Sequence, residues 1–335
     1  MSEKKRRISL VVDRLGWAWH SMALGLQKYA PSWCKCDICT QDEMNDVASE
    51  EYDAVLWFSW SSANTRIRQR LVSLVASHSI EHTPWKSTLE KRHPDCVDEN
   101  WSACVASRLA NHWTAIKRLP IFSGLIAVTP ALLQAAKNIF DVKQATYLPA
   151  GIDPALWPYA PARPPGDKLR VGWCGQYDER KPDPKGVRWV LRPLMTRLGP
   201  EVEWVLNMRD VEHALTQVQM REWYREIDVL LVTSINEGTP MPMLEAMSSG
   251  RSVLATTVGD ASQMVETGKT GALLGGYEDG KSAENVIVLA SYWLRKLSEE
   301  RELAAQMGVY AAKLVCEQRS WETLAGDWLT FISPP

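Results

Sequence analysis

Residues 228–257 read DVLLVTSINEGTPMPMLEAMSSGRSVLATT, and this stretch shows how the chain folds. An apolar run at 229–232 is followed by a polar loop, a segment with helical spacing, and a second apolar run at 252–255. This order of strand, loop, helix and strand is typical of parallel α/β units. Thr239 suits the N-cap and Pro240 the first helical position, so the sequence predicts that the helix begins at Pro240.

Short apolar runs alternate with helical patterns along the whole chain, which predicts an α/β protein with parallel sheets. The runs form two series, so we expect two Rossmann-like sheets. The first series has predicted strands at 8–12, 54–58, 71–75, 125–128 and 145–148, with helices at 21–29, 101–117 and 130–138. The second has predicted strands at 169–174, 202–206, 229–232, 252–255 and 272–274, with helices at 283–297, 301–316 and 321–332.

The length of 335 residues favours two domains, each large enough to bury its own core. Prolines are dense between 149 and 165, as in an exposed connection between domains. We therefore predict an N-terminal domain at 1–150, a linker at 151–168 and a C-terminal domain at 169–318. The last helix, at 319–335, is a candidate for packing back on the N-terminal domain.

Composition indicates a globular protein, with 45% hydrophobic and 23% charged residues. No apolar run reaches the roughly 18 residues that a membrane-spanning helix needs, so we expect no stable membrane insertion and a cytoplasmic location. Seven cysteines, an odd number, favour free thiols. Cys34, Cys36 and Cys39 have a spacing that could seed a zinc site, but no second ligand pair follows at finger spacing. A short strand is the favoured interpretation, and we expect no metal.

The helix start at 238–241 is a candidate anion site, because the first backbone N–H groups of a helix and its dipole attract negative charge. Gly238, Thr239, Pro240 and Met241 are the candidate binding residues. Glu245 follows Pro240 by roughly 7 Å along the helix axis, a spacing that suits a ribose joined to a diphosphate. Glu237 precedes the helix and could reach the hydroxyls of a further sugar.

The segment 237–250, together with 252–259 and 265–271, resembles the donor-binding region of the family 4 retaining glycosyltransferases. The resemblance consists of two glutamates eight apart, Gly-x-Pro after the first, Ala-Met-x-x-Gly after the second, and a later Glu-x-x-x-x-x-Gly. Residues 149–153 also resemble the family's Pro-x-Gly-x-Asp hinge. The resemblance covers 148–275 and implies a GT-B fold, two Rossmann-like domains facing each other across a cleft. It also implies a nucleotide-sugar donor, retention of configuration and no metal.

Family members carry a Gly-Arg…Lys-Gly pattern that grips the donor diphosphate. Residues 175–186 of this chain read GQYDERKPDPKG, so Lys185 matches the family lysine while Gln176 replaces the arginine. Arg180 and Lys181 are then candidates for the second cation, with Arg180 assigned to catalysis and Lys181 to binding. Positive charge belongs there because the leaving diphosphate gains negative charge as the glycosidic bond breaks.

In GT-B enzymes the loop after the first strand contributes to the acceptor side, and here it reads DRLGWAWH at 13–20. Gly16 could let the backbone approach the donor phosphates. His20 is a candidate for deprotonating the acceptor, and His78 and His82 are further candidates. A histidine at a helix start is also often a local hydrogen-bonding residue. The tryptophans near the predicted strand ends suit either a stacking platform or the core: Trp17, Trp19, Trp57, Trp60 and Trp85.

Three functions remain open from the sequence. The first is transfer of a hexosyl or pentosyl group to a glycan, a small molecule or a lipid-linked acceptor. The second is a phage-type transfer to hydroxymethylated pyrimidines in DNA, in the host cytoplasm, since residues 1–150 carry 18 Lys and Arg against 15 Asp and Glu. The third is a nucleotide-sugar epimerase or a non-catalytic nucleotide-sugar binding protein. The sequence specifies neither the donor nucleotide nor the acceptor.

Overall fold

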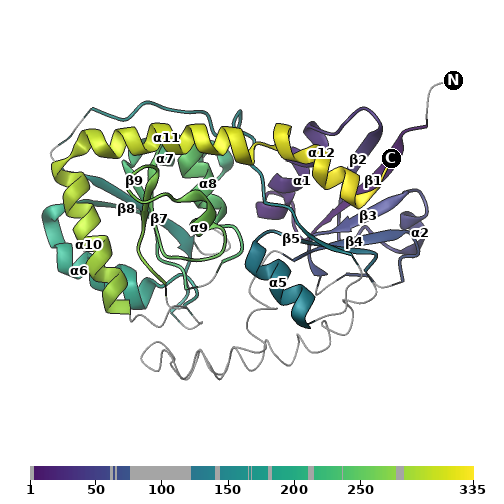
Figure 1. Cartoon of the computed structure of the whole chain (residues 1–335), viewed down its shortest axis with the longest axis horizontal. Helices are drawn as coiled ribbons and strands as arrows, with labels where there is room; N and C mark the ends of the chain where they lie inside the picture. Colours follow the sequence, from purple (N-terminus) through teal and green to yellow (C-terminus); the bar gives the residue numbers. More distant parts are fainter. Residues whose placement is uncertain are drawn as a thin grey trace. The chain divides into compact units, whose positions relative to one another are not determined.

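The computed structural model describes residues 4–60, 63–64, 66–75, 122–139, 144–164, 166, 168–179, 183–209, 215–235, 237–276 and 283–335. These residues form two compact units. The first contains the described residues of 4–75 and 122–153 together with Gln318–Pro335, and the second contains those of Pro154–Glu317. Each unit has one parallel sheet with helices (Figure 1), which confirms the α/β class and the two Rossmann-like sheets. The helix predicted at 101–117 lies outside the described residues.

The first unit has a six-stranded sheet in the order β2-β1-β3-β4-β5-β6. Every pair is parallel, and the central strands are buried along their length, as expected for a sheet covered on both faces. The strands are β1 Arg6–Val12, β2 Cys34–Thr40, β3 Ala54–Trp57, β4 Arg70–Val75, β5 Gly124–Ala127 and β6 Ala145–Tyr147. The helices are α1 Ala18–Lys28, α2 Asp46–Ser49, α5 Pro130–Ile139 and α12 Trp321–Ile332.

The cysteine run lies on β2, as the strand interpretation predicted. Cys34 and Cys36 are two residues apart and both buried, so they face the same side of the sheet. Burial raises the pKa of the Cys36 thiol well above its ordinary value, which favours a neutral packed side chain.

The last helix packs within the first unit, against α1 and against strands β3 and β4. The buried ring of Trp321 lies directly on Gly25 and Gly151, where an added Cβ would stand 2.0 and 2.7 Å from its atoms. Two backbone hydrogen bonds join the start of this helix to the segment 149–153: Ile152 N–H to Arg319 O at 2.7 Å, and Trp321 N–H to Ile152 O at 2.9 Å. The chain therefore ends in the unit in which it begins.

The second unit has a five-stranded parallel sheet in the order β11-β10-β9-β7-β8. The strands are β7 Arg170–Gln176, β8 Glu203–Arg209, β9 Val229–Val232, β10 Ser252–Ala255 and β11 Gly271–Leu273. The α-helices are α6 Arg192–Leu198, α7 Gln217–Glu226, α8 Met241–Ser248, α9 Ala261–Met264, α10 Ala283–Glu299 and α11 Arg301–Arg319. A π-helical turn at Val187–Leu191 and a 3-10 turn at Gly199–Glu201 flank α6.

The sequence patterns did not predict α7, although its start carries a readable signal. Thr216 and Gln219 form a capping box, in which each side chain accepts a hydrogen bond from the backbone N–H of the other residue. The buried residues of this helix stand at helical spacing: Met220, Trp223 and Tyr224.

The central helix α8 begins one residue later than predicted. Pro240 is the N-cap, with ψ at 93°, and Met241 is the first helical residue. Thr239 was the predicted cap, but its hydroxyl donates to the Asp260 carboxylate at 3.5 Å, which takes its side chain away from the helix end. Within the part of the chain that the structure describes, no helix is long and apolar enough to cross a bilayer.

Candidate functional site

The strongest candidate site lies at the carboxyl end of β9, in the second unit. β9 is buried throughout and lies between β7 and β10, so the loops that follow these three strands meet at one edge of the sheet. Ligands of open α/β sheets bind at such edges. A small pocket opens there, lined by Trp173, Cys174, Lys185, Leu230, Leu231, Val232, Thr233, Ser234, Glu237, Pro240 and Pro242.

Lys185 and Glu237 form an ion pair in this pocket, although 52 residues separate them. The Nζ of Lys185 donates to Oε1 of Glu237, and the Ser234 hydroxyl donates to the same oxygen at 2.7 Å. The Glu237 side chain is 11% exposed and that of Lys185 is 29% exposed. Ser234 had no predicted role, because a polar residue after a buried strand is common in any loop.

The backbone of Lys185 is held by Thr233, the residue that directly follows β9. The Thr233 hydroxyl donates to Lys185 O at 2.6 Å and accepts from the indole N–H of buried Trp173 at 2.9 Å. Gly186 has φ of +69°, and a Cβ there would stand 2.1 Å from Thr233 O. Only glycine allows both this conformation and this close approach. The loop after β7 is thus fastened to the loop after β9.

The loop that carries Glu237 is supported from its other side by the turn after β10. Gly259 has φ of +48°, and a Cβ there would lie 1.7 Å from Gly238 O. The next residue, buried Asp260, donates its backbone N–H to the same carbonyl at 2.9 Å. This support places Gly238 and Thr239 directly before the start of α8.

Helix α8 places Glu245 on the same side of the second unit as Tyr224, whose hydroxyl donates to Glu245 Oε2 at 2.7 Å. The first turn of any α-helix leaves backbone N–H groups without intrahelical partners. Gly238 and Pro240 are buried, while Thr239 and Met241 are partly exposed. The predicted anion-binding positions therefore lie together at the helix start, and their role in binding stays a prediction.

The second cation was assigned to Arg180 or Lys181, and both lie outside the described residues. Two other arginines follow Lys185 on the π-helical turn and on α6. The guanidinium groups of Arg188 and Arg192 lie 5.9 and 5.2 Å from the ring centroid of Tyr177. Both also bind Glu179, Arg188 through the backbone oxygen and Arg192 through the carboxylate. These arginines hold the loop after β7 in place.

In the first unit, the loop after β1 contains two more predicted residues, Gly16 and His20. The Gly16 N–H donates to Nδ1 of His20 at 2.9 Å, and burial lowers the pKa of this histidine below its ordinary value. The ring is therefore neutral near pH 7 with its proton on Nε2. In this arrangement the lone pair of Nδ1 is already used to stabilise the loop, while the proposed role in deprotonation stays a prediction.

The tryptophans of the first unit divide between the two interpretations. Trp57 and Trp60 are buried, which confirms core packing for these two. Trp17 is 36% exposed, and the guanidinium of Arg14 lies over its ring at 5.2 Å from the centroid. Trp19 is half-buried. Trp85, like His78 and His82, lies outside the described residues.

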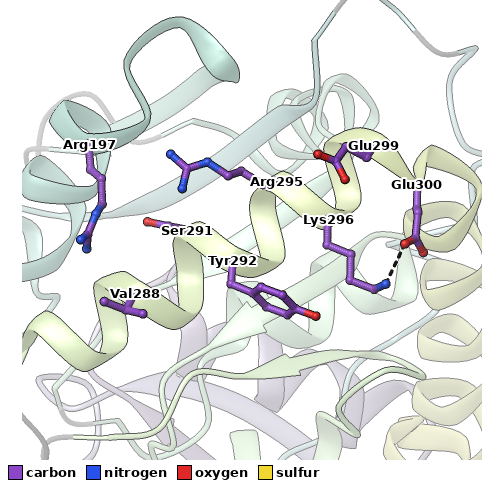
Figure 2. A pocket seen from close by; sticks show the side chains of 8 residues that line it. All are labelled: Arg197, Val288, Ser291, Tyr292, Arg295, Lys296, Glu299 and Glu300. Carbon is purple, nitrogen blue, oxygen red and sulfur yellow. Dashed lines mark hydrogen bonds and ion pairs between the residues drawn. The ribbon is translucent and has the colours of Figure 1, made fainter.

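A groove along α10 in the second unit is a weaker candidate (Figure 2). Its lining residues are Arg197, Val288, Ser291, Tyr292, Arg295, Lys296, Glu299 and Glu300. The three cations each pair with a carboxylate: Arg197 with Glu284, Arg295 with Glu201 and Lys296 with Glu300. Because these charges are already compensated, the groove has no concentration of positive charge for a phosphate.

Residues 197–291, within the second unit, match the family model described as Glycosyl transferases group 1. A D-inositol 3-phosphate glycosyltransferase of Streptomyces avermitilis is 33% identical over 135 residues, which cover 40% of this chain and 26% of that protein. The corresponding protein of Streptomyces scabiei is 32% identical over 135 residues, covering 40% and 27%. The match thus spans about a quarter of the length of these relatives.

Solved structures similar to this chain cover nearly all of it. Sucrose-phosphate synthase from Thermosynechococcus elongatus has a TM-score of 0.66 at 15% identity, with 98% of both chains covered. Anabaena HepE in complex with UDP-glucose has a TM-score of 0.61 at 16% identity, with 98% of this chain and 100% of that chain covered. The fold is therefore that of the GT-B glycosyltransferases, with two Rossmann-like domains, as the resemblance implied.

Proposed function

We propose that this protein is a glycosyltransferase that moves a sugar from a nucleotide-sugar donor to an acceptor hydroxyl. The proposal rests on one observation: Lys185 and Glu237 form an ion pair beside the start of α8. A cation and a helix N-terminus in one pocket suit the diphosphate of such a donor, and the carboxylate beside them suits the hydroxyls of its transferred sugar. The Glycosyl transferases group 1 match of residues 197–291 supports the same conclusion.

Lys185 is proposed to stabilise the leaving diphosphate. Its ammonium group has three donors, so it can retain Glu237 and still donate to a phosphate oxygen. The backbone N–H groups at the start of α8 add partial positive charge at the same place. Stabilisation of charge that develops in the transition state is usually the largest single contribution to catalysis. With these groups the proposed reaction requires no metal.

The two glutamates are proposed to bind the two sugars of the donor. Glu245 lies one helical turn beyond the anion site and would accept hydrogen bonds from the ribose hydroxyls. Glu237, in the loop before the helix, would accept from hydroxyls of the transferred sugar. We propose retention of configuration, in which the acceptor proton passes to a donor phosphate oxygen on the face that the nucleotide leaves.

The experiment that tests this function is nucleotide release from a donor panel, with and without acceptors. UDP-sugars come first because the structurally similar HepE binds UDP-glucose, followed by GDP- and ADP-sugars. The expected result is release that depends on one donor class and rises when a suitable acceptor is added. Tight donor binding without turnover would point to a binding protein, and an isomerised sugar nucleotide would point to an epimerase.

A further inference from the structure

Tyr224 is a buried residue on α7 that belongs to none of the motifs of the sequence. Its hydroxyl donates to Oε2 of Glu245 on α8 at 2.7 Å. Its ring contacts two indoles edge to face: Trp157 at 5.7 Å and Trp223 at 5.1 Å between ring centroids. Because the ring is enclosed by aromatic neighbours and fully buried, the hydroxyl is held in one place.

We propose that Tyr224 is a positioning residue that orients the Glu245 carboxylate for the ribose of the donor. The inference rests on the proposed function, in which Glu245 binds the ribose hydroxyls. A glutamate on a helix surface samples several rotamers, and fixing it costs conformational entropy when a ligand binds. A hydrogen bond from a rigid phenol to a carboxylate is short and strong, so it fixes the side chain before the donor arrives.

The geometry separates this role from simple packing. A buried phenol needs a hydrogen-bond partner, and a backbone carbonyl would serve the core equally well. Here the partner is Glu245, the one carboxylate on α8, five residues after Pro240. Removal of the hydroxyl leaves the ring packing with both tryptophans in place, so the protein should stay folded while ribose recognition is weakened.

The test measures binding by calorimetry for UDP, GDP and ADP, each beside its 2′,3′-dideoxy analogue. The variants are Tyr224→Phe, Glu245→Ala and the double variant. For the nucleotide that the wild type binds, Tyr224→Phe should weaken affinity about tenfold. Binding of the dideoxy analogue should change little, because that ligand lacks the hydroxyls that Glu245 accepts. In the Glu245→Ala protein, Tyr224→Phe should have no further effect, because no carboxylate remains to be oriented.

Tyr292→Phe is the matched control, since Tyr292 is 57% exposed on α10 in the same unit. The inference is overturned if Tyr224→Phe leaves ribonucleotide affinity unchanged, if it weakens ribose and dideoxyribose ligands equally, or if it costs as much without Glu245. If the folded wild type binds none of the nucleotides, the proposed function itself fails and the inference falls with it. These outcomes distinguish the two failures.

Discussion

The loop after β9 in the second unit and the loop after β1 in the first unit both follow a parallel strand, yet they are held in different ways. The loop after β9 is supported by residues far away in sequence: Lys185 contacts Glu237, and the turn at Gly259 lies against Gly238. The loop after β1 has local contacts, such as Gly16 with His20 and Arg14 with Trp17, and residues 13–18 are exposed.

This difference agrees with the proposed roles of the two units, donor binding by the second and acceptor binding by the first. A pocket whose charged groups are fixed before binding suits the diphosphate, because charge stabilisation depends on groups that need not reorganise. An exposed loop with short-range contacts can adapt its shape, which suits the more variable acceptor.

Replacing Lys185 by alanine should remove most turnover while the protein stays folded. Loss of one well-placed charge-stabilising donor typically lowers kcat about 10² to 10³-fold. The measurement is steady-state nucleotide release under saturating donor. Lys313→Ala, at a side chain that is 71% exposed on α11, is the control and should behave as wild type. Near-normal activity of the Lys185 variant would remove this residue from the site.

Two glycine substitutions compare the loops directly. Both Gly16 and Gly186 have positive φ, but only at Gly186 would a Cβ meet backbone, at 2.1 Å from Thr233 O, whereas nothing lies within 4 Å of the corresponding position at Gly16. Gly16→Ala should cost about 1 kcal/mol of unfolding free energy for the left-handed conformation alone. Gly186→Ala should cost clearly more, about 3 kcal/mol. Urea unfolding measures both, and equal costs would contradict the tight junction between the loops.

Replacing Ser234 by alanine should have a smaller effect, because Lys185 still contacts the same Glu237 oxygen. Loss of a hydrogen bond to a charged group predicts a decrease of about tenfold in kcat/KM. Ser291→Ala is the control, since the Ser291 hydroxyl donates to a backbone oxygen within α10. An unchanged kcat/KM in the Ser234 variant would show that Lys185 alone is sufficient to orient Glu237.

His20 should produce a small dependence of stability on pH. Its folded-state pKa is lowered by burial, so the unfolded state binds the proton more readily, and stability falls as the pH drops below the ordinary value of about 6.5. Protonation of Nδ1 would also end its bond with the Gly16 N–H. Between about pH 7 and pH 5.5 the wild type should therefore lose more thermal stability than His20→Gln. Parallel melting curves would argue against the buried, neutral ring.

Elements with strong periodicity could be predicted from the sequence. The limits 229–232 and 252–255 match β9 and β10, and the predicted 321–332 matches α12. The start of α8 differs by one residue because Asp260, remote in sequence, engages the Thr239 side chain. Helix α7 was missed, although its capping box at Thr216 and Gln219 and the helical spacing of Met220, Trp223 and Tyr224 are present in the sequence.

Some residues of the site could likewise be predicted from the sequence, and others could not. The spacing of Glu237 and Glu245 around a predicted helix start marked the two glutamates in the sequence, and the resemblance to the family's Lys-Gly pattern marked Lys185. Ser234 and Tyr224 could be recognised only in the structure. Neither residue stands at a distinctive spacing in the sequence. Each is recognised by its hydrogen bond to a glutamate of the site, Ser234 to Glu237 and Tyr224 to Glu245.

By itself, the amino-acid sequence determined the local pattern of this protein: buried strands, the loop and helix that follow β9, and the charges placed along them. These features depend on neighbours within a few residues, so periodicity and capping preferences specify them. Which charged side chains contact one another depends on the tertiary structure. Because β7 pairs with β9 as well as with β8, the loop carrying Lys185 comes to lie beside Glu237. That order of strands results from the packing of the whole sheet, to which residues distant in sequence contribute.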